Sequence, residues 1–81
     1  MDAEEINALI ESLAQIEDDI SVPKNVKTRI NNAVKALQGE GDMKIKASKA
    51  MQELDEISDD PNIPSYIRPQ IWNVVSMLAG F

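Results

Sequence analysis

Apolar residues recur every three or four positions along most of this 81-residue chain, which is the spacing of one face of an α-helix. Four stretches follow the pattern, so the sequence predicts four amphipathic helices that each bury one stripe. The predicted stripes are Ile6, Leu9, Ile10, Leu13, Ile16 and Ile20; Val26, Ile30, Ala33, Val34 and Leu37; Met43, Ala47, Ala50, Met51, Leu54 and Ile57; and Ile67, Ile71, Val74, Val75 and Leu78.

Cap and breaker residues set the expected helix boundaries. The first helix is expected from about Ala3 to Asp18, with Asp2 as its N-cap. Gly39 and Gly41 are expected to end the second helix by adopting left-handed conformations. The other expected boundaries are Pro23 at the start of the second helix, Asp42 as the cap of the third, Pro64 at the start of the fourth and Gly80 at its end.

Pro69 conflicts with a continuous fourth helix. It falls in the second turn after Pro64, where a proline removes a backbone donor and crowds the preceding turn. Two alternatives follow. Either residues 64–68 form a separate short turn, or the fourth helix bends there.

The same acidic elbow occurs twice, 41 residues apart, at residues 16–23 and 57–64. Each copy closes one apolar stripe with paired aspartates and leads through a β-branched residue and a proline into the next. At this offset the core, elbow and helix-end positions coincide in the two halves. The first-half residues with an identical counterpart are Leu13, Ile16, Asp18, Asp19, Pro23, Ile30, Asn32, Val34, Leu37 and Gly39.

This match predicts two duplicated helical hairpins, about residues 2–40 and 42–81. Hairpins of about 40 residues resemble the units of HEAT and armadillo arrays, which usually need three or more units. Two units can instead cover each other's apolar sides. We therefore predict an all-α fold, a four-helix antiparallel bundle with pseudo-twofold symmetry that forms a single domain over residues 1–81. An open pair of hairpins that dimerises is the alternative.

The amino-acid composition excludes several kinds of catalytic and metal site. The chain has no cysteine and no histidine, which removes thiolate metal sites, the commonest general base and the commonest imidazole ligand. It also lacks a nucleophile–base pair, a glycine-rich phosphate loop and a metal-ligand spacing. We therefore expect a protein that is not an enzyme, with no catalytic, cofactor or metal residues and no small-molecule substrate.

The formal net charge of −6 opposes general binding to nucleic acid or anionic lipid. No apolar run reaches the roughly 18 residues needed to span a bilayer. We therefore expect a cytoplasmic protein that does not enter a membrane.

The paired aspartates of the elbows, Asp18–Asp19 and Asp59–Asp60, are candidate cation ligands because carboxylates bind Mg²⁺ and Ca²⁺. Their spacing matches no twelve-residue calcium loop. Aspartate in a turn commonly accepts hydrogen bonds from nearby backbone N–H groups, which explains its presence in both elbows. We favour this structural role over metal binding.

Seven of the eight basic residues lie between positions 24 and 49, where they could form a positive surface over the second and third helices. No aromatic residue alternates with these lysines as a stacking platform would require. A phosphate-binding, RNA- or ribosome-associated role is therefore the alternative function. Its candidate contacts are Lys24, Lys27, Lys35, Lys46 and Lys49.

The fourth helical stretch carries the strongest functional signal. Trp72 lies off the predicted apolar stripe, and its counterpart in the first half is Asn31. It either covers the edge of the core or forms a surface patch with Tyr66 and Met77, and exposed aromatic patches mark partner surfaces. We therefore predict a protein–protein interaction module, with another protein or a second copy as partner and Tyr66, Trp72 and Met77 as contacts.

The segments Ser21–Val26 and Asp59–Pro64 resemble a small archaeal family of uncharacterised proteins, one of the UPF families, and the similarity covers nearly the whole chain. The resemblance implies a compact four-helix protein in an archaeal cytoplasm. It implies no activity and no functional residues.

Overall fold

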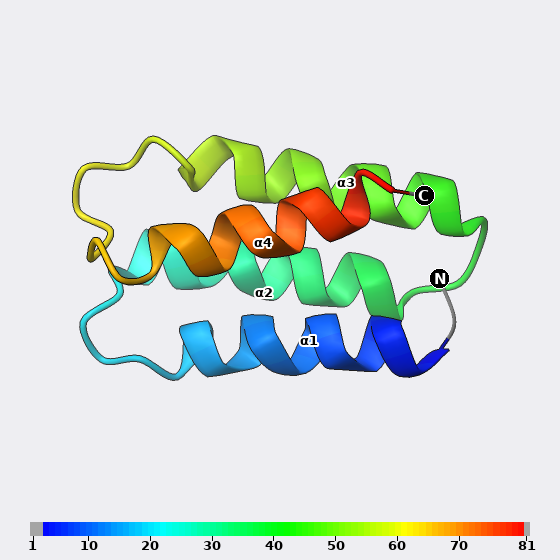
Figure 1. Ribbon diagram of the computed structural model, residues 1–81, viewed down its shortest axis with the longest axis horizontal. Helices are drawn as coiled ribbons and strands as arrows, with labels where there is room; N and C mark the ends of the chain where they lie inside the picture. Colours follow the sequence, from blue (N-terminus) through cyan, green and yellow to red (C-terminus); the bar gives the residue numbers. More distant parts are fainter. Residues whose placement is uncertain (1–2, 81) are drawn as a thin grey trace.

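The computed structural model describes residues 3–80 and forms four α-helices, with no strand in that range (Figure 1). The helices are α1 (Ala3–Glu17), α2 (Lys24–Gln38), α3 (Met43–Ile57) and α4 (Arg68–Leu78). The predicted all-α four-helix bundle is confirmed. The first two helices begin and end within one residue of their expected boundaries, and α3 begins directly after its predicted cap; the predicted cap at Asp2 lies outside the described residues.

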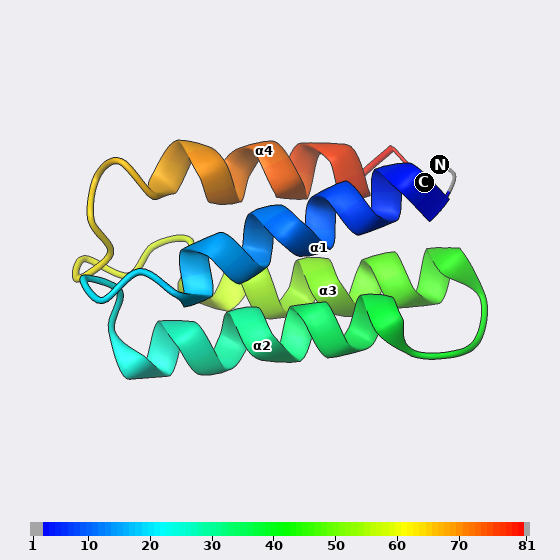
Figure 2. The ribbon, with the colours of Figure 1, turned by 90° about the horizontal axis from the view of Figure 1, so that it is seen from below.

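The helices pack as a closed ring. α1 packs against α2 and α4, and α3 packs against the same two helices. In Figure 1, α3 lies above and α1 below, while α4 is nearer the viewer than α2; Figure 2 shows the same ring turned by 90°. Successive helices run in opposite directions because the connections between them are short. Each hairpin therefore covers the apolar side of the other, and the alternative of an open pair is not observed.

The core is aliphatic and receives side chains from all four helices. The buried residues are Leu9, Leu13, Ile16, Val22, Val26, Ile30, Ala33, Leu37, Ala47, Ala50, Leu54, Ile57, Ile63, Ile67, Ile71, Val74 and Leu78. Most of the predicted stripe positions are among them. Val22 and Ile63 were not in the predicted stripes, yet each is only 4% exposed, so both elbows anchor themselves in the core.

Ile20 was predicted to continue the first stripe, and this prediction is wrong. The residue is 94% exposed. Its sequence position fits the helical period, but α1 ends at Glu17 and Ile20 lies in the following turn. Periodicity places a side chain on a face only while the backbone remains helical.

The start of α4 was predicted at Pro64 and lies instead at Arg68. Of the two alternatives raised by Pro69, the structure shows the separate turn. The Ile67 N–H donates to the Pro64 carbonyl at 2.9 Å, and regular helical bonding begins with the Ile71 N–H donating to Ile67 at 3.1 Å. Pro69 thus occupies the first turn of α4, where a missing N–H costs nothing.

The connection between α2 and α3 follows its prediction in part. The Asp42 carboxylate caps α3 by accepting a hydrogen bond from the Lys44 N–H at 2.7 Å, as expected. Gly41 has a φ of 117°, which favours glycine. Gly39 has a φ of −69°, so the left-handed conformation predicted for it is wrong.

In the part of the chain that the structure describes, no helix is both long and apolar enough to cross a membrane.

The burial pattern predicts the cost of a core cavity. Leu54 is fully buried, so we expect Leu54→Ala to lower the free energy of unfolding by about 2–5 kcal/mol. Ile20→Ala is the control, because this equally aliphatic but exposed side chain should change stability by no more than about 0.5 kcal/mol. Urea denaturation followed by circular dichroism measures both. Equal losses would contradict the end of α1 at Glu17.

Candidate functional site

Trp72 projects from the outside of the bundle and is 55% exposed. The aliphatic residues that α4 buries are Ile71, Val74 and Leu78, and they fill its side of the core without the indole. The tryptophan is therefore a surface residue with one face available to another molecule.

The flank of α4 that carries Trp72 faces α3. At about 100° per residue, Trp72 lies within about 40° of both Arg68 and Ala79 around the helix axis. The Arg68 guanidinium donates to the backbone carbonyls of Ser58 and Asp60, which follow α3, at 3.1 and 2.8 Å. Arg68 thus identifies the side of α4 that is turned toward α3, and Trp72 shares it.

The other two predicted partner contacts lie elsewhere. Met77 is about 140° away from Trp72 around α4 and is half-buried against the core. Tyr66 is 54% exposed and precedes α4, and its hydroxyl donates to the Asp19 carboxylate after α1 at 2.7 Å. The three residues therefore do not share one stripe of the helix.

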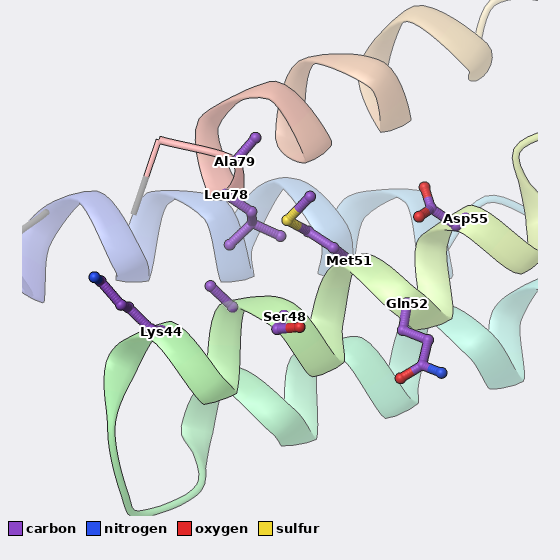
Figure 3. A pocket seen from close by; sticks show the side chains of 8 residues that line it. Lys44, Ser48, Met51, Gln52, Asp55, Leu78 and Ala79 are labelled. Atoms are coloured by element: carbon purple, nitrogen blue, oxygen red, sulfur yellow. The ribbon is translucent and has the colours of Figure 1, made fainter.

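A hollow of about 430 Å³ lies between α3 and the end of α4 (Figure 3). Its lining residues are Lys44, Ala47, Ser48, Met51, Gln52, Asp55, Leu78 and Ala79. Two of its lining residues have small side chains, Ala47 and Ser48, at positions where the first half of the sequence carries Ile6 and Asn7. Sequence analysis missed this site, although the exchange of isoleucine for alanine was visible at the 41-residue offset.

The lysines predicted to contact phosphate divide into two groups. Lys24, Lys27 and Lys35 line a second hollow, of about 370 Å³, on the outer surface of α2. Its other lining residues are Glu17, Thr28, Asn31 and Asn32. Lys46 and Lys49 lie on α3 and do not line this hollow.

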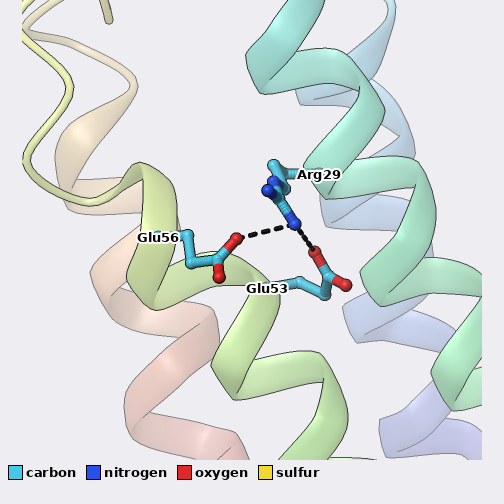
Figure 4. A network of polar contacts seen from close by, with 3 residues as sticks. All are labelled: Arg29, Glu53 and Glu56. Atoms are coloured by element: carbon cyan, nitrogen blue, oxygen red, sulfur yellow. Dashed lines mark hydrogen bonds and ion pairs between the residues drawn. The ribbon is translucent and has the colours of Figure 1, made fainter.

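Arg29 is held by an ion-pair network between α2 and α3 (Figure 4). Its guanidinium lies 3.0 Å from a Glu53 carboxylate oxygen and 2.6 Å from one of Glu56. The hydrogen bond that Arg29 donates to Glu53, followed by the charge of Glu56, raises the pKa of Arg29. Two carboxylates thus neutralise this cation, and it is not available to an anionic ligand.

The two elbows have the same hydrogen bonds. The Asp19 carboxylate accepts from the Ser21 N–H, and the Asp60 carboxylate accepts from the Asn62 N–H, each at 2.8 Å. These contacts are the turn-forming role predicted for the aspartates. Within residues 3–80, no three acidic side chains gather in an arrangement that could hold a metal ion.

Each elbow also accepts a side-chain hydrogen bond from the other half. Tyr66 donates to Asp19 at 2.7 Å, and Asn25 donates to Asp60 at 3.2 Å. Asn25 and Tyr66 are 41 residues apart, so the two bonds join corresponding positions. This reciprocal pairing supports the pseudo-twofold symmetry, which stays a prediction.

The sequence profile described as "Uncharacterised protein family (UPF0147)" matches residues 1–80. The chain belongs to this family. The UPF0147 chain is also similar to a solved structure described as "Crystal structure of unknown function protein MMP1188", with a TM-score of 0.94 and 35% sequence identity. That similarity covers 100% of this chain and 93% of the other. A comparison with curated proteins gives no match.

These findings confirm the resemblance that the elbow segments carried, and they confirm the four-helix fold of this UPF0147 member. Neither description names a ligand or a partner. The functional argument for the family therefore rests on the exposed surfaces.

The contact between Tyr66 and Asp19 predicts a titration effect. The phenol, followed by the Ser21 N–H, lowers the pKa of the Asp19 carboxyl, and the same contact raises the pKa of Tyr66. A carboxyl whose pKa is lower in the folded state stabilises the protein at pH values above the ordinary aspartate pKa. This stabilisation is lost as the pH falls through the pKa of the folded state. Because the phenol is the largest single cause of the shift, Tyr66→Phe should raise the Asp19 pKa toward its ordinary value.

A pH titration of the side-chain carboxyl carbons by NMR measures this change. Trp72→Phe is the control, because it alters an exposed aromatic residue that does not contribute to the pKa shift of Asp19 and should leave the Asp19 titration unchanged. The same Asp19 curve in Tyr66→Phe and the unaltered protein would mean that the hydrogen bond does not form in solution.

Proposed function

We propose that this protein is a non-enzymatic interaction module that binds another protein through α4, with Trp72 as the anchor. The single observation that carries the proposal is the 55% exposure of Trp72 on a helix whose core contacts are complete without it. Tryptophan is enriched among the residues that dominate binding energy at protein interfaces. The cytoplasmic location implied by the family resemblance belongs to the same proposal.

The hollow between α3 and the end of α4 is lined by Ala79, which shares the Trp72 flank, so a partner anchored on Trp72 would also reach this hollow. Met51, Leu78 and Ala79 supply apolar surface, while Ser48 and Gln52 supply hydrogen-bonding groups. An apolar centre bordered by polar side chains is the usual anatomy of a protein interface. The surface therefore suits a partner that offers an apolar side chain with polar groups around it.

Tyr66 and Met77 are proposed to contribute less to partner binding than Trp72. The Tyr66 hydroxyl is bound to Asp19, and Met77 already packs against the core. A partner that reaches across α4 would contact the exposed ring of Tyr66. Trp72 is the stronger anchor for two reasons. Its ring is larger, and in the described part of the chain it forms no hydrogen bond with another side chain.

Replacement of the anchor tests the proposal. Trp72→Ala should preserve helical content and reduce binding by at least about 2 kcal/mol, roughly thirtyfold, because truncating an interface tryptophan typically costs that much. The immobilised protein is incubated with a native cell extract, and captured partners are quantified together with the circular dichroism spectrum of each variant.

Ile20→Ala is the matched control, since it removes another exposed apolar side chain outside α4 and its flanks. Partners retained by the unaltered protein and by Ile20→Ala, but not by Trp72→Ala, are the expected result. Equal retention by all three would exclude Trp72 as the anchor.

A second candidate function is contact with phosphate groups, as in an RNA- or ribosome-associated factor. The observation that favours it is the hollow on α2, where Lys24, Lys27 and Lys35 converge. Glu17 lines the same hollow and accepts a hydrogen bond from Asn31 at 3.1 Å, which places a negative charge among the lysines. With a net charge of −6, this reduces long-range attraction to RNA and ranks the function second.

The salt dependence of RNA binding tests this candidate. If the three lysines contact phosphates, replacing Lys24, Lys27 and Lys35 by glutamine should weaken retention on total RNA and reduce the salt slope by roughly 2, at about 0.7 per phosphate contact. Lys44→Gln is the control because Lys44 lies at the other hollow. RNA retention that does not depend on salt, or that the triple variant leaves unchanged, would rule the candidate out.

A further inference from the structure

We infer that the protein bound at the α3–α4 surface is a second copy of this chain, in an antiparallel dimer in which each Trp72 enters the hollow of the other copy. This inference rests on the proposed function and names its partner. A twofold dimer requires a self-complementary surface, in which the groups at one end match those at the other. The α3–α4 surface meets this requirement in charge and in shape.

Charge is arranged for self-pairing. Lys44 and Asp55 lie at opposite ends of the hollow, eleven residues apart on one flank of α3, which is about 16 Å along the helix (Figure 3). Neither side chain forms an ion pair among the described residues. A twofold axis between them, near Ser48 and Met51, sets Lys44 of each copy against Asp55 of the other.

The positions of Trp72 and the hollow also agree with this twofold axis. Trp72 precedes Ala79 by two helical turns, about 10 Å along α4. Because α4 runs antiparallel to α3, Trp72 lies level with the Asp55 end of the surface, while Ala79 lines the hollow toward Lys44. The rotation that joins Lys44 to Asp55 therefore carries each indole to the hollow of the other copy, whose volume of about 430 Å³ admits an aromatic side chain.

The first half of the chain lacks both features. Asn31 occupies the position that corresponds to Trp72, and Ile6 occupies the position that corresponds to Ala47. The opposite side of the bundle thus offers neither an indole nor the small residue that opens the hollow. One self-complementary surface per chain closes at two copies, whereas two such surfaces would produce an open chain of copies.

Light scattering after size-exclusion chromatography tests the dimer, since each chain has a mass of 9.0 kDa. The unaltered protein should have twice that mass at high concentration and dissociate on dilution. Trp72→Ala should be monomeric at the same concentrations while keeping its circular dichroism spectrum.

Charge reversal tests the antiparallel arrangement independently of the indole. Lys44→Asp and Asp55→Lys should each weaken dimerisation roughly tenfold, because each places two pairs of like charges in contact. The double variant Lys44→Asp/Asp55→Lys restores both pairs and should dimerise as the unaltered protein does. Lys49→Asp, a reversal on the flank of α3 turned toward α2, is the control and should have no effect.

The outcomes separate this inference from the proposed function. A protein that is monomeric at every concentration overturns the dimer, and the proposed function then stands if capture of a different protein still depends on Trp72. A dimer that Trp72→Ala leaves intact, or that the double charge reversal fails to restore, uses another surface and also overturns the inference. Loss of both the dimer and Trp72-dependent capture removes the inference and the proposed function together.

Discussion

The structure depends on one constraint, which is that two short helical hairpins must cover each other's apolar sides. Neither hairpin has enough residues to bury its own stripe, so the four helices close into a ring around a purely aliphatic core. No polar or charged side chain is buried in the described part of the chain. Every group capable of recognition is consequently displayed on the outside of the bundle.

The elbows connect this core to the surface. Val22 and Ile63 anchor them in the apolar interior, and the aspartates beside them fold the backbone into matching turns. Asp19 and Asp60 then each accept a hydrogen bond from the other half of the chain. Two of the four aspartates that were candidate cation ligands in the sequence thus link the two hairpins.

Two differences between the halves lie where function is proposed. The exchange of Ile6 for Ala47 and of Asn31 for Trp72 removes apolar bulk beneath one surface and adds an aromatic side chain beside it. Both changes lie on the α3–α4 side, and core positions that are identical in the two halves, such as Leu13 and Leu54, remain buried.

The sequence by itself determined the number of helices, most of the buried stripes and the aspartate turns, because these depend on spacing and hydrogen bonds within a few residues. Only the tertiary structure decided which distant side chains meet, as in Arg29 with Glu53 and Tyr66 with Asp19. It also decided that Ile20 is exposed and that a hollow opens between α3 and the end of α4. The physical reason is that these features depend on where each helix stops and on how neighbouring helices are placed, and no local pattern encodes either.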